Sequence, residues 1–208
     1  VEVHETDNHF LAQSTLDGAL TASSALRGLA VNLQKIANDI RLLGSGPRAG
    51  IGEIALPAVQ PGSSIMPGKV NPVIPEAVIQ AASQVLACDT ALVQGAQGGY
   101  FELNTMMPFV AHNLLQAISL LTNSSDIFAE KCISGIESTE RGPEILMSGL
   151  MLATTLAPVI GYEKAAKIAK EAHATGQTVL ETALDLTDLS EDELVKILNP
   201  EKMVQPQA

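Results

Sequence analysis

The chain of 208 residues is long enough to bury one sizeable core, or a larger core with a small appendage, and no apolar run in it reaches the ~18 residues of a membrane span. Its net charge of −11 repels phosphate backbones, which argues against nucleic acid as a partner, and it also opposes the steering of an anionic substrate. Aromatic residues make up only 3% and Trp is absent, so the core must be aliphatic and closely packed, which favours helices.

The first residues are polar and irregular. His4, Glu5, Asp7 and His9 are residue types that bind metals, but a solvated lead-in explains them equally well because no pair of histidines lies four residues apart. Since the chain begins at Val1, without an initiator methionine or a signal peptide, we expect a fragment or a processed product.

A long helix is predicted over residues 10–43, where leucine and isoleucine recur at helical spacing up to the glycine at 44. A helix of ~30 residues is about 45 Å long, which is more than one small domain covers. We therefore expect partner helices, from other subunits. In the glycine-rich turn that follows, Arg48 could bind an anion, but a structural salt bridge explains it better.

The segment 62–72 has no helical or strand period and reads Gly-Ser-Ser-Ile-Met-Pro-Gly-Lys-Val-Asn-Pro. Its glycines let backbone N–H groups approach a ligand, and Lys69 and Asn71 offer a charge and an amide suited to a carboxylate. On spacing alone, a polar surface turn is as good an interpretation as a site.

Two further helices complete the first part of the chain. One is predicted over 75–93, with Pro75 and Glu76 in its first turn, and one over 101–130, with a kink or a restart at Pro108. Glu102 and Asn104 are interpreted as a satisfied polar pair inside a helical bundle.

A change in composition near 131–143 predicts a boundary between a central helical bundle segment, 1–134, and a C-terminal helical domain, 135–208. The second part has helical runs at 144–156, 162–175, 178–186 and 190–198, the last opening with a capping box of Ser190 and Glu193. The fold class is therefore all-α. Cys88 and Cys132 lack metal-ligand spacing and are predicted to be buried reduced thiols of a cytoplasmic protein.

The segment 62–72 resembles the signature loop of the fumarase/aspartase superfamily. Further stretches look like segments of class II fumarate hydratases and extend the match over nearly the whole chain: 36–41, 45–48, 50–54, 101–104, 160–162 and 199–204. Gly68 is similar to fumarases, whereas aspartases usually have alanine at that position.

The resemblance implies reversible hydration of fumarate to L-malate, a reaction of the tricarboxylic acid cycle, without a metal or an organic cofactor. It implies that Ser63 is the catalytic base and that Glu76 orients a catalytic histidine on another segment. It also implies that the substrate carboxylates are bound by residues of the loop, namely Ser64, Lys69, Val70 and Asn71.

The resemblance further implies a homotetramer with a 20-helix core, in which each active site combines segments of three chains. The upstream Thr-His pair of the family is missing, and none of the chain's histidines, at 4, 9, 112 and 173, lies in that motif. We therefore expect a C-terminal fragment that is inactive when isolated. Three alternatives stay open: an aspartate ammonia-lyase, a helical oligomerisation module without activity, and a crystallin-like reuse of the fold.

Overall fold

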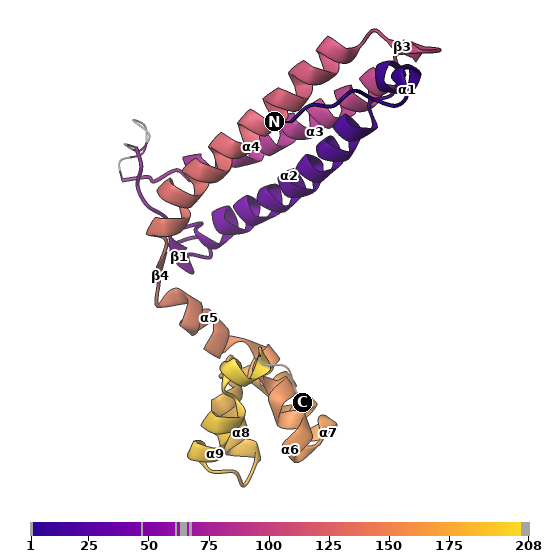
Figure 1. The fold of residues 1–208 in the computed structure, drawn as a ribbon. Helices are drawn as coiled ribbons and strands as arrows, with labels where there is room; N and C mark the ends of the chain where they lie inside the picture. The colour runs from indigo at the N-terminus through magenta and orange to yellow at the C-terminus, as the bar shows by residue number, and fades with distance from the viewer. Residues whose placement is uncertain (1, 47, 61, 63–65, 67, 205–208) are drawn as a thin grey trace. The chain divides into compact units, whose positions relative to one another are not determined.

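Aliphatic side chains at helical spacing fold most of this chain into helices, and the only strands in its described part are two residues long (Figure 1). The prediction of an all-α fold is thus confirmed. The computed structural model describes residues 2–46, 48–60, 62, 66 and 68–204. By its internal contacts the chain divides into two compact units, Val1–Ser138 and Thr139–Ala208.

Unit 1 is built on three long helices that lie side by side (Figure 1): α2 (Asp17–Leu43), α3 (Val73–Ala96) and α4 (Met107–Lys131). Small buried residues let the helix axes approach closely, and larger ones fill the rest of the core. The two clusters that hold the bundle contain Ala30, Ala82, Val85, Cys88, Ala117 and Leu121, and Ala37, Ile40, Val78, Phe128 and Cys132. Both cysteines are buried and free, as predicted.

The predicted helix 10–43 is wrong at one point, because the structure breaks it into α1 (His9–Ser14) and α2. Thr15 adopts an extended backbone, with φ −108° and ψ 154°. Its hydroxyl donates to the carbonyl of Leu11 at 3.2 Å, and the hydroxyl of Ser14 donates to Phe10 at 2.7 Å. Hydroxyl side chains compete in this way with the helical ladder, which ends α1 before Asp17 opens the next helix.

The predicted helix 101–130 is also wrong at its start. Residues 99–104 form a hairpin of β2 (Gly99–Tyr100) and β3 (Leu103–Asn104), and α4 begins only at Met107, so the restart predicted at Pro108 is confirmed. The Asn104 side chain is buried; its amide donates to the carbonyl of Gly95 at 3.0 Å and its oxygen accepts from the Met106 N–H at 2.7 Å. Glu102 is exposed, so the predicted buried pair of Glu102 and Asn104 does not form.

Unit 1 ends at a second two-stranded pair. After η1 (Ile133–Gly135), the strand β4 (Glu137–Ser138) runs antiparallel to β1 (Ile54–Ala55). This pairing ties residues 137–138 to the first unit. The division into functional domains at 134/135 stays a prediction.

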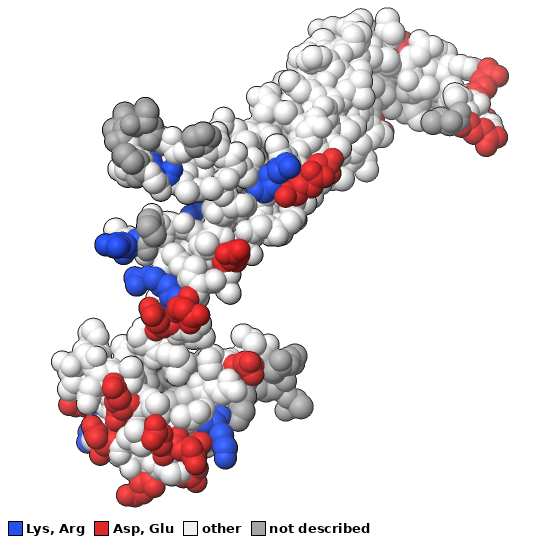
Figure 2. Space-filling model, turned by 90° about the vertical axis from the view of Figure 1, so that its left-hand side faces the viewer, with Lys and Arg blue, Asp and Glu red and all other residues white. Residues whose placement is uncertain are grey.

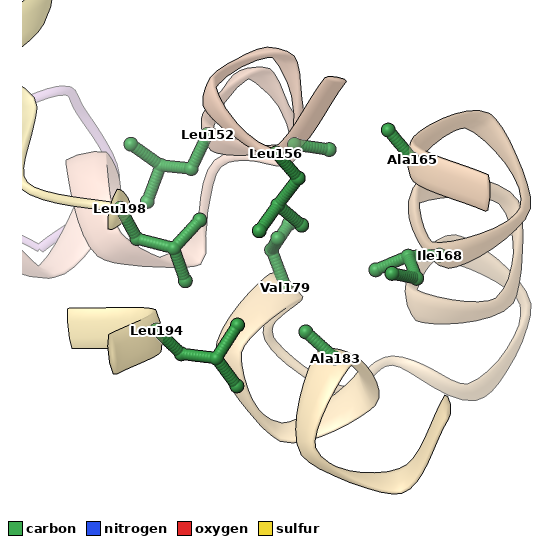
Figure 3. Packing of buried hydrophobic residues seen from close by; sticks show 9 residues of the cluster. Leu152, Leu156, Ala165, Ile168, Val179, Ala183, Leu194 and Leu198 are labelled. Carbon is green, nitrogen blue, oxygen red and sulfur yellow. The ribbon is translucent and has the colours of Figure 1, made fainter. Parts of the chain in front are cut away.

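Unit 2 has short helices around its own core (Figure 3). They are α5 (Arg141–Ser148), η2 (Leu150–Leu156), α6 (Ala157–Ile160), α7 (Tyr162–Thr175), α8 (Val179–Leu186), α9 (Glu191–Ile197) and η3 (Pro200–Met203). Aliphatic side chains from these elements and from the residue after α9 converge in the core: Leu152, Leu156, Ala165, Ile168, Val179, Ala183, Leu194 and Leu198 (Figure 3). The run predicted at 144–156 is interrupted at Gly149, which has an extended backbone.

Two capping boxes begin helices of unit 2. The predicted one is confirmed: the Glu193 carboxylate accepts from the Ser190 N–H at 2.9 Å and from its hydroxyl at 2.7 Å. Thr178 and Glu181 form a second box at the start of α8. Both carboxyl groups have a pKa below the usual value because they accept these hydrogen bonds.

Charged side chains are sparse on the face of the unit 1 bundle shown in Figure 2. Several aliphatic residues of α2 and α4 are exposed: Leu29, Val31, Ile36, Leu42, Leu115, Ile118 and Ile127. Among the described residues, no single helix has the length and apolarity needed to cross a bilayer. Only the bent pair 141–148 and 150–160 passes that test, by length and composition alone.

Candidate functional site

Two described residues of the segment 62–72, Gly62 and Lys69, approach each other through their backbones. A Cβ atom added to Gly62 would lie 2.0 Å from the carbonyl oxygen of Lys69, so only glycine fits where the two ends of the loop meet. The Lys69 N–H donates to Met66 at 3.2 Å, and Gly68 has a φ of +79° that favours glycine. The predicted base Ser63 and the predicted ligand Ser64 lie outside the described residues.

The last part of the loop carries the cationic and amide groups predicted for substrate binding. Lys69 and Val70 are exposed and Asn71 is half-buried. The Asn71 carbonyl accepts from the Val73 N–H at 2.9 Å, which leads the loop directly into α3. Neither the Lys69 ammonium nor the Asn71 side chain bonds to another residue in the described part of the chain, so both are available to a ligand.

Glu76 occupies the first turn of α3, where a carboxylate interacts favourably with the helix dipole. Its N–H donates to the carbonyl of Pro72 at 3.1 Å. Its Oε1 accepts from Nη2 of Arg41 at 3.5 Å, and both side chains are about two-fifths exposed, at 39% and 42%. The structure thus brings Lys69, Asn71 and Glu76 onto one short stretch at the start of a helix.

A small pocket lies where the loop meets the ends of α3 and α4. Its lining is largely aliphatic and consists of Leu56, Pro57, Val59, Asn71, Pro72, Val73, Ile74, Pro75, Lys131 and Cys132. Its volume of about 10 Å³ corresponds to one water-sized sphere, far less than a four-carbon diacid needs. Burial raises the pKa of the Cys132 thiol, so this cysteine is kept protonated and unreactive.

The other candidate ligands of the sequence do not come together with the loop. His9 lies 3.2 Å from Glu5 and His4 lies 3.4 Å from Glu2, all of them exposed near the N-terminus. Within the described ranges no three histidine, cysteine or acidic side chains form a group that could hold a metal. Arg48 is exposed and forms no ion pair with a described residue, so the structural salt bridge expected for it is not found there.

Polar contacts between helices were not predicted. Arg41 of α2 pairs with Glu76 of α3, and Ser23 and Arg27 of α2 bind the buried Asp89 of α3. Helical spacing indicates which residues of one helix share a face, but it does not say where a second helix meets that face. The sequence held one indication of the second contact: Asp89 lies in a largely aliphatic helix. A carboxylate that is buried in such a helix needs a polar partner.

Comparison with known proteins identifies similar chains. Residues 1–87 match the family described as lyase, and residues 152–205 match the one described as fumarase C C-terminus. Fumarate hydratase class II 2 of Pseudomonas aeruginosa is 49% identical over 198 residues, which are 95% of this chain and 43% of that protein. An aspartate ammonia-lyase of a Bacillus species is 46% identical over 196 residues, 94% of this chain and 42% of that protein.

A solved structure is similar over the same extent. It is the fumarate lyase:delta crystallin from Brucella melitensis bound to cobalt, with a TM-score of 0.92 and 47% identity over 99% of this chain and 45% of that one. The chain therefore spans less than half the length of these relatives. Since the hydratase and the ammonia-lyase match almost equally well, overall identity does not separate the two reactions.

Proposed function

We propose, since this chain belongs to the fumarase/aspartase superfamily and matches class II fumarate hydratases over nearly all its residues, that its protein hydrates fumarate reversibly to L-malate. The observation that carries the proposal is the closure of the loop between Gly62 and Lys69, followed at once by Asn71 and Glu76. This arrangement collects a cation, an amide and a carboxylate within one short stretch. The whole reaction further requires residues that align with the other part of the relatives.

The loop would bind the diacid and remove its proton. A proton next to a carboxylate is very weakly acidic, so the dianionic form created by its removal needs positive charge and N–H donors in place. We assign Ser63 as the base that takes the C3 proton of malate, and we assign Ser64, Lys69 and Asn71, with Val70, to the substrate carboxylates. A serine hydroxyl is a poor base unless its alkoxide is stabilised, which the Lys69 charge favours.

The departing hydroxyl of malate then needs a proton from a second group. We propose that another segment supplies a histidine that donates this proton. Glu76 would orient the histidine and stabilise its protonated form. Glu76 suits the task because it is half exposed at a helix start and has one carboxylate oxygen, Oε2, that accepts no hydrogen bond from a described residue.

We also propose that the protein acts as a cytoplasmic homotetramer. The exposed aliphatic residues of α2 and α4 are the kind of surface that partner helices cover. The free, buried state of both cysteines fits a reducing compartment. In such an assembly the site would combine this loop with segments of neighbouring chains.

The reaction is tested by offering L-malate and L-aspartate to the full-length protein and following the ultraviolet absorbance of fumarate. We expect fumarate from malate alone. Ser63→Ala should lower kcat by about a thousandfold, because it removes the base. The matched control is Ser83→Ala, on an exposed face of α3, where the hydroxyl only donates to Ile79 at 2.8 Å. An unchanged rate for Ser63→Ala contradicts the assignment, and turnover of aspartate favours the ammonia-lyase.

The 208-residue chain by itself should be inactive, because the proposed histidine is supplied by another segment. The same assay on the purified chain checks this expectation. Substantial hydration by the chain alone would show that these 208 residues contain the complete machinery and would contradict a histidine supplied from elsewhere.

A further inference from the structure

The ends of two long helices meet at the candidate site. Arg41 lies in the last turn of α2 and Glu76 in the first turn of α3, 35 residues apart in sequence, with 3.5 Å between Nη2 and Oε1. The position of Arg41 suits a cation at a helix C-terminus, and that of Glu76 suits an anion at an N-terminus. Each charge is therefore favourable in its own helix, and the contact joins side chains from the two helix ends.

The packing of α2 on α3 does not depend on this pair. The aliphatic cluster of Ala37, Ile40 and Val78 already holds the same ends of the helices. Because Arg41 and Glu76 are both about two-fifths exposed, an ion pair between them adds little to stability. What the contact does determine is where the carboxylate of Glu76 points.

We propose that Arg41 is a positioning residue for catalysis: it holds Glu76 through Oε1, so that Oε2 is presented to the histidine that another segment supplies. This inference rests on the role proposed above for Glu76. Among the described residues Oε2 accepts no hydrogen bond, so the contact with Arg41 occupies one carboxylate oxygen of Glu76 and leaves the other open.

In the described part of the chain, Arg41 is the one cation that pairs with Glu76. Asp39, near Arg41 on α2, is paired with Lys35. The end of α4 contributes Lys131 and Cys132 to the pocket beside residues 71–75, and neither forms an ion pair or hydrogen bond with Glu76. Lys69, in the loop before α3, also forms no hydrogen bond or ion pair with it.

The test uses Arg41→Gln in the full-length protein, with kcat and KM for L-malate measured across a range of pH. We expect kcat to fall ten- to a hundredfold while KM changes less than twofold, because the substrate ligands are intact. The limb of the pH profile that reports the histidine should move to higher pH, since a positive charge near the imidazolium is lost. Arg41→Lys should recover part of kcat, because an ammonium can still pair with Oε1.

The matched control is Lys35→Gln, which removes the same charge from the same helix and leaves Glu76 untouched. Its kcat and pH profile should equal those of the unmodified protein. If Arg41→Gln lowers only the thermal midpoint and keeps the kcat and pH profile of Lys35→Gln, the role of Arg41 is structural and the proposal is overturned.

A double-mutant cycle tests whether Arg41 acts through Glu76. In a Glu76→Gln background, Arg41→Gln should cause no further loss of kcat; equal losses in both backgrounds overturn the proposal. If Arg41→Gln does not fold, the same cycle is measured with Arg41→Lys. We then expect kcat to fall about threefold when Glu76 is present and not at all in the Glu76→Gln background. If the unmodified protein turns over aspartate instead of malate, the proposed reaction fails, and the cycle is then measured on aspartate.

Discussion

Gly62 can lie against Lys69 in the loop 62–72 because it has no side chain. Its α-carbon faces the carbonyl of Lys69 so closely that a methyl group would lie 2.0 Å from that oxygen. Contacts this short do not occur between real atoms, so any other residue at 62 must push the two ends of the loop apart. The close approach of Lys69 to Gly62 thus depends on residue 62 having only a hydrogen atom as its side chain.

Gly62→Ala should therefore lower kcat/KM for malate by about a hundredfold or more, since a shift of about 1 Å in binding groups has an effect of that size. The thermal midpoint should change little, because no described residue of the loop belongs to the core clusters. Gly18→Ala, in the first turn of α2 with open space around it, is the control and should leave activity unchanged. A wild-type kcat/KM in Gly62→Ala would mean that catalysis does not require the close approach of Gly62 and Lys69.

A second prediction at this scale concerns Glu193. Its pKa is lowered from 4.5 in the folded chain by the hydrogen bonds from Ser190, so it stabilises α9 above pH 4.5, and this contribution is lost as the pH falls through the lowered pKa. Glu193→Gln should reduce the thermal midpoint at pH 7 and have progressively less effect in acid. Glu191→Gln, in the same first turn without a hydrogen bond to Ser190, should show a smaller effect at pH 7. A difference between Glu193→Gln and wild type that is the same at all pH values would contradict this reading.

At the scale of elements, α2 and α3 are joined by a polar contact inside an aliphatic bundle. The carboxylate of Asp89 on α3 accepts from the Ser23 hydroxyl at 2.6 Å and from Nη1 of Arg27 at 2.7 Å. Asp89 is buried, with a side chain 9% exposed, whereas that of Arg27 is 50% exposed. A buried carboxylate that is satisfied in only one register makes every other sliding position of the two helices unfavourable.

Arg27→Met should destabilise the protein by about 2 kcal/mol, because it leaves a buried charge with one neutral partner. Replacing Asp89 by Leu at the same time should restore stability to within about 1 kcal/mol of wild type, since no uncompensated charge remains. Urea unfolding of the three proteins measures both effects. Equal destabilisation in the single and double variants would show that Arg27 acts by packing alone.

At the scale of the whole molecule, the long helices expose aliphatic side chains of the kind that protein interfaces cover. Leu115 on α4 is 66% exposed, and several residues of α2 and α4 share this character. The face of unit 1 shown in Figure 2 carries few charges that would prevent another helix from packing on it.

Leu115→Asp should weaken association of the full-length protein, because a carboxylate placed in an apolar interface loses its hydration. Sedimentation velocity is expected to show smaller species than for wild type. Val195→Asp, on α9 of unit 2 and 53% exposed, is the control and should sediment like wild type. If Leu115→Asp also sediments like wild type, this part of α4 is not an interface.

Much of the fold was predictable because helices are local structures. The stripes of leucine and isoleucine, the proline at 108 and the serine and glutamate of α9 act within a few residues of one another, so their meaning can be derived without the rest of the chain. The loop 62–72 was recognised for the same reason, because its motif consists of consecutive residues. The hairpin at 99–104 was missed because the buried Asn104 amide that anchors it bonds to Gly95, across a turn that helical periodicity does not describe.

By itself, the sequence determined that this protein is helical and where its long helices run, to within a turn at most ends, and it singled out residues 62–72 as the candidate site. Only the tertiary structure decided that Gly62 lies against Lys69, that Asp89 meets Ser23 and Arg27, and that Arg41 reaches Glu76. The physical reason is range: propensity and capping depend on neighbours in the chain, whereas these contacts depend on how whole helices pack, and that is set by the summed burial of many aliphatic side chains.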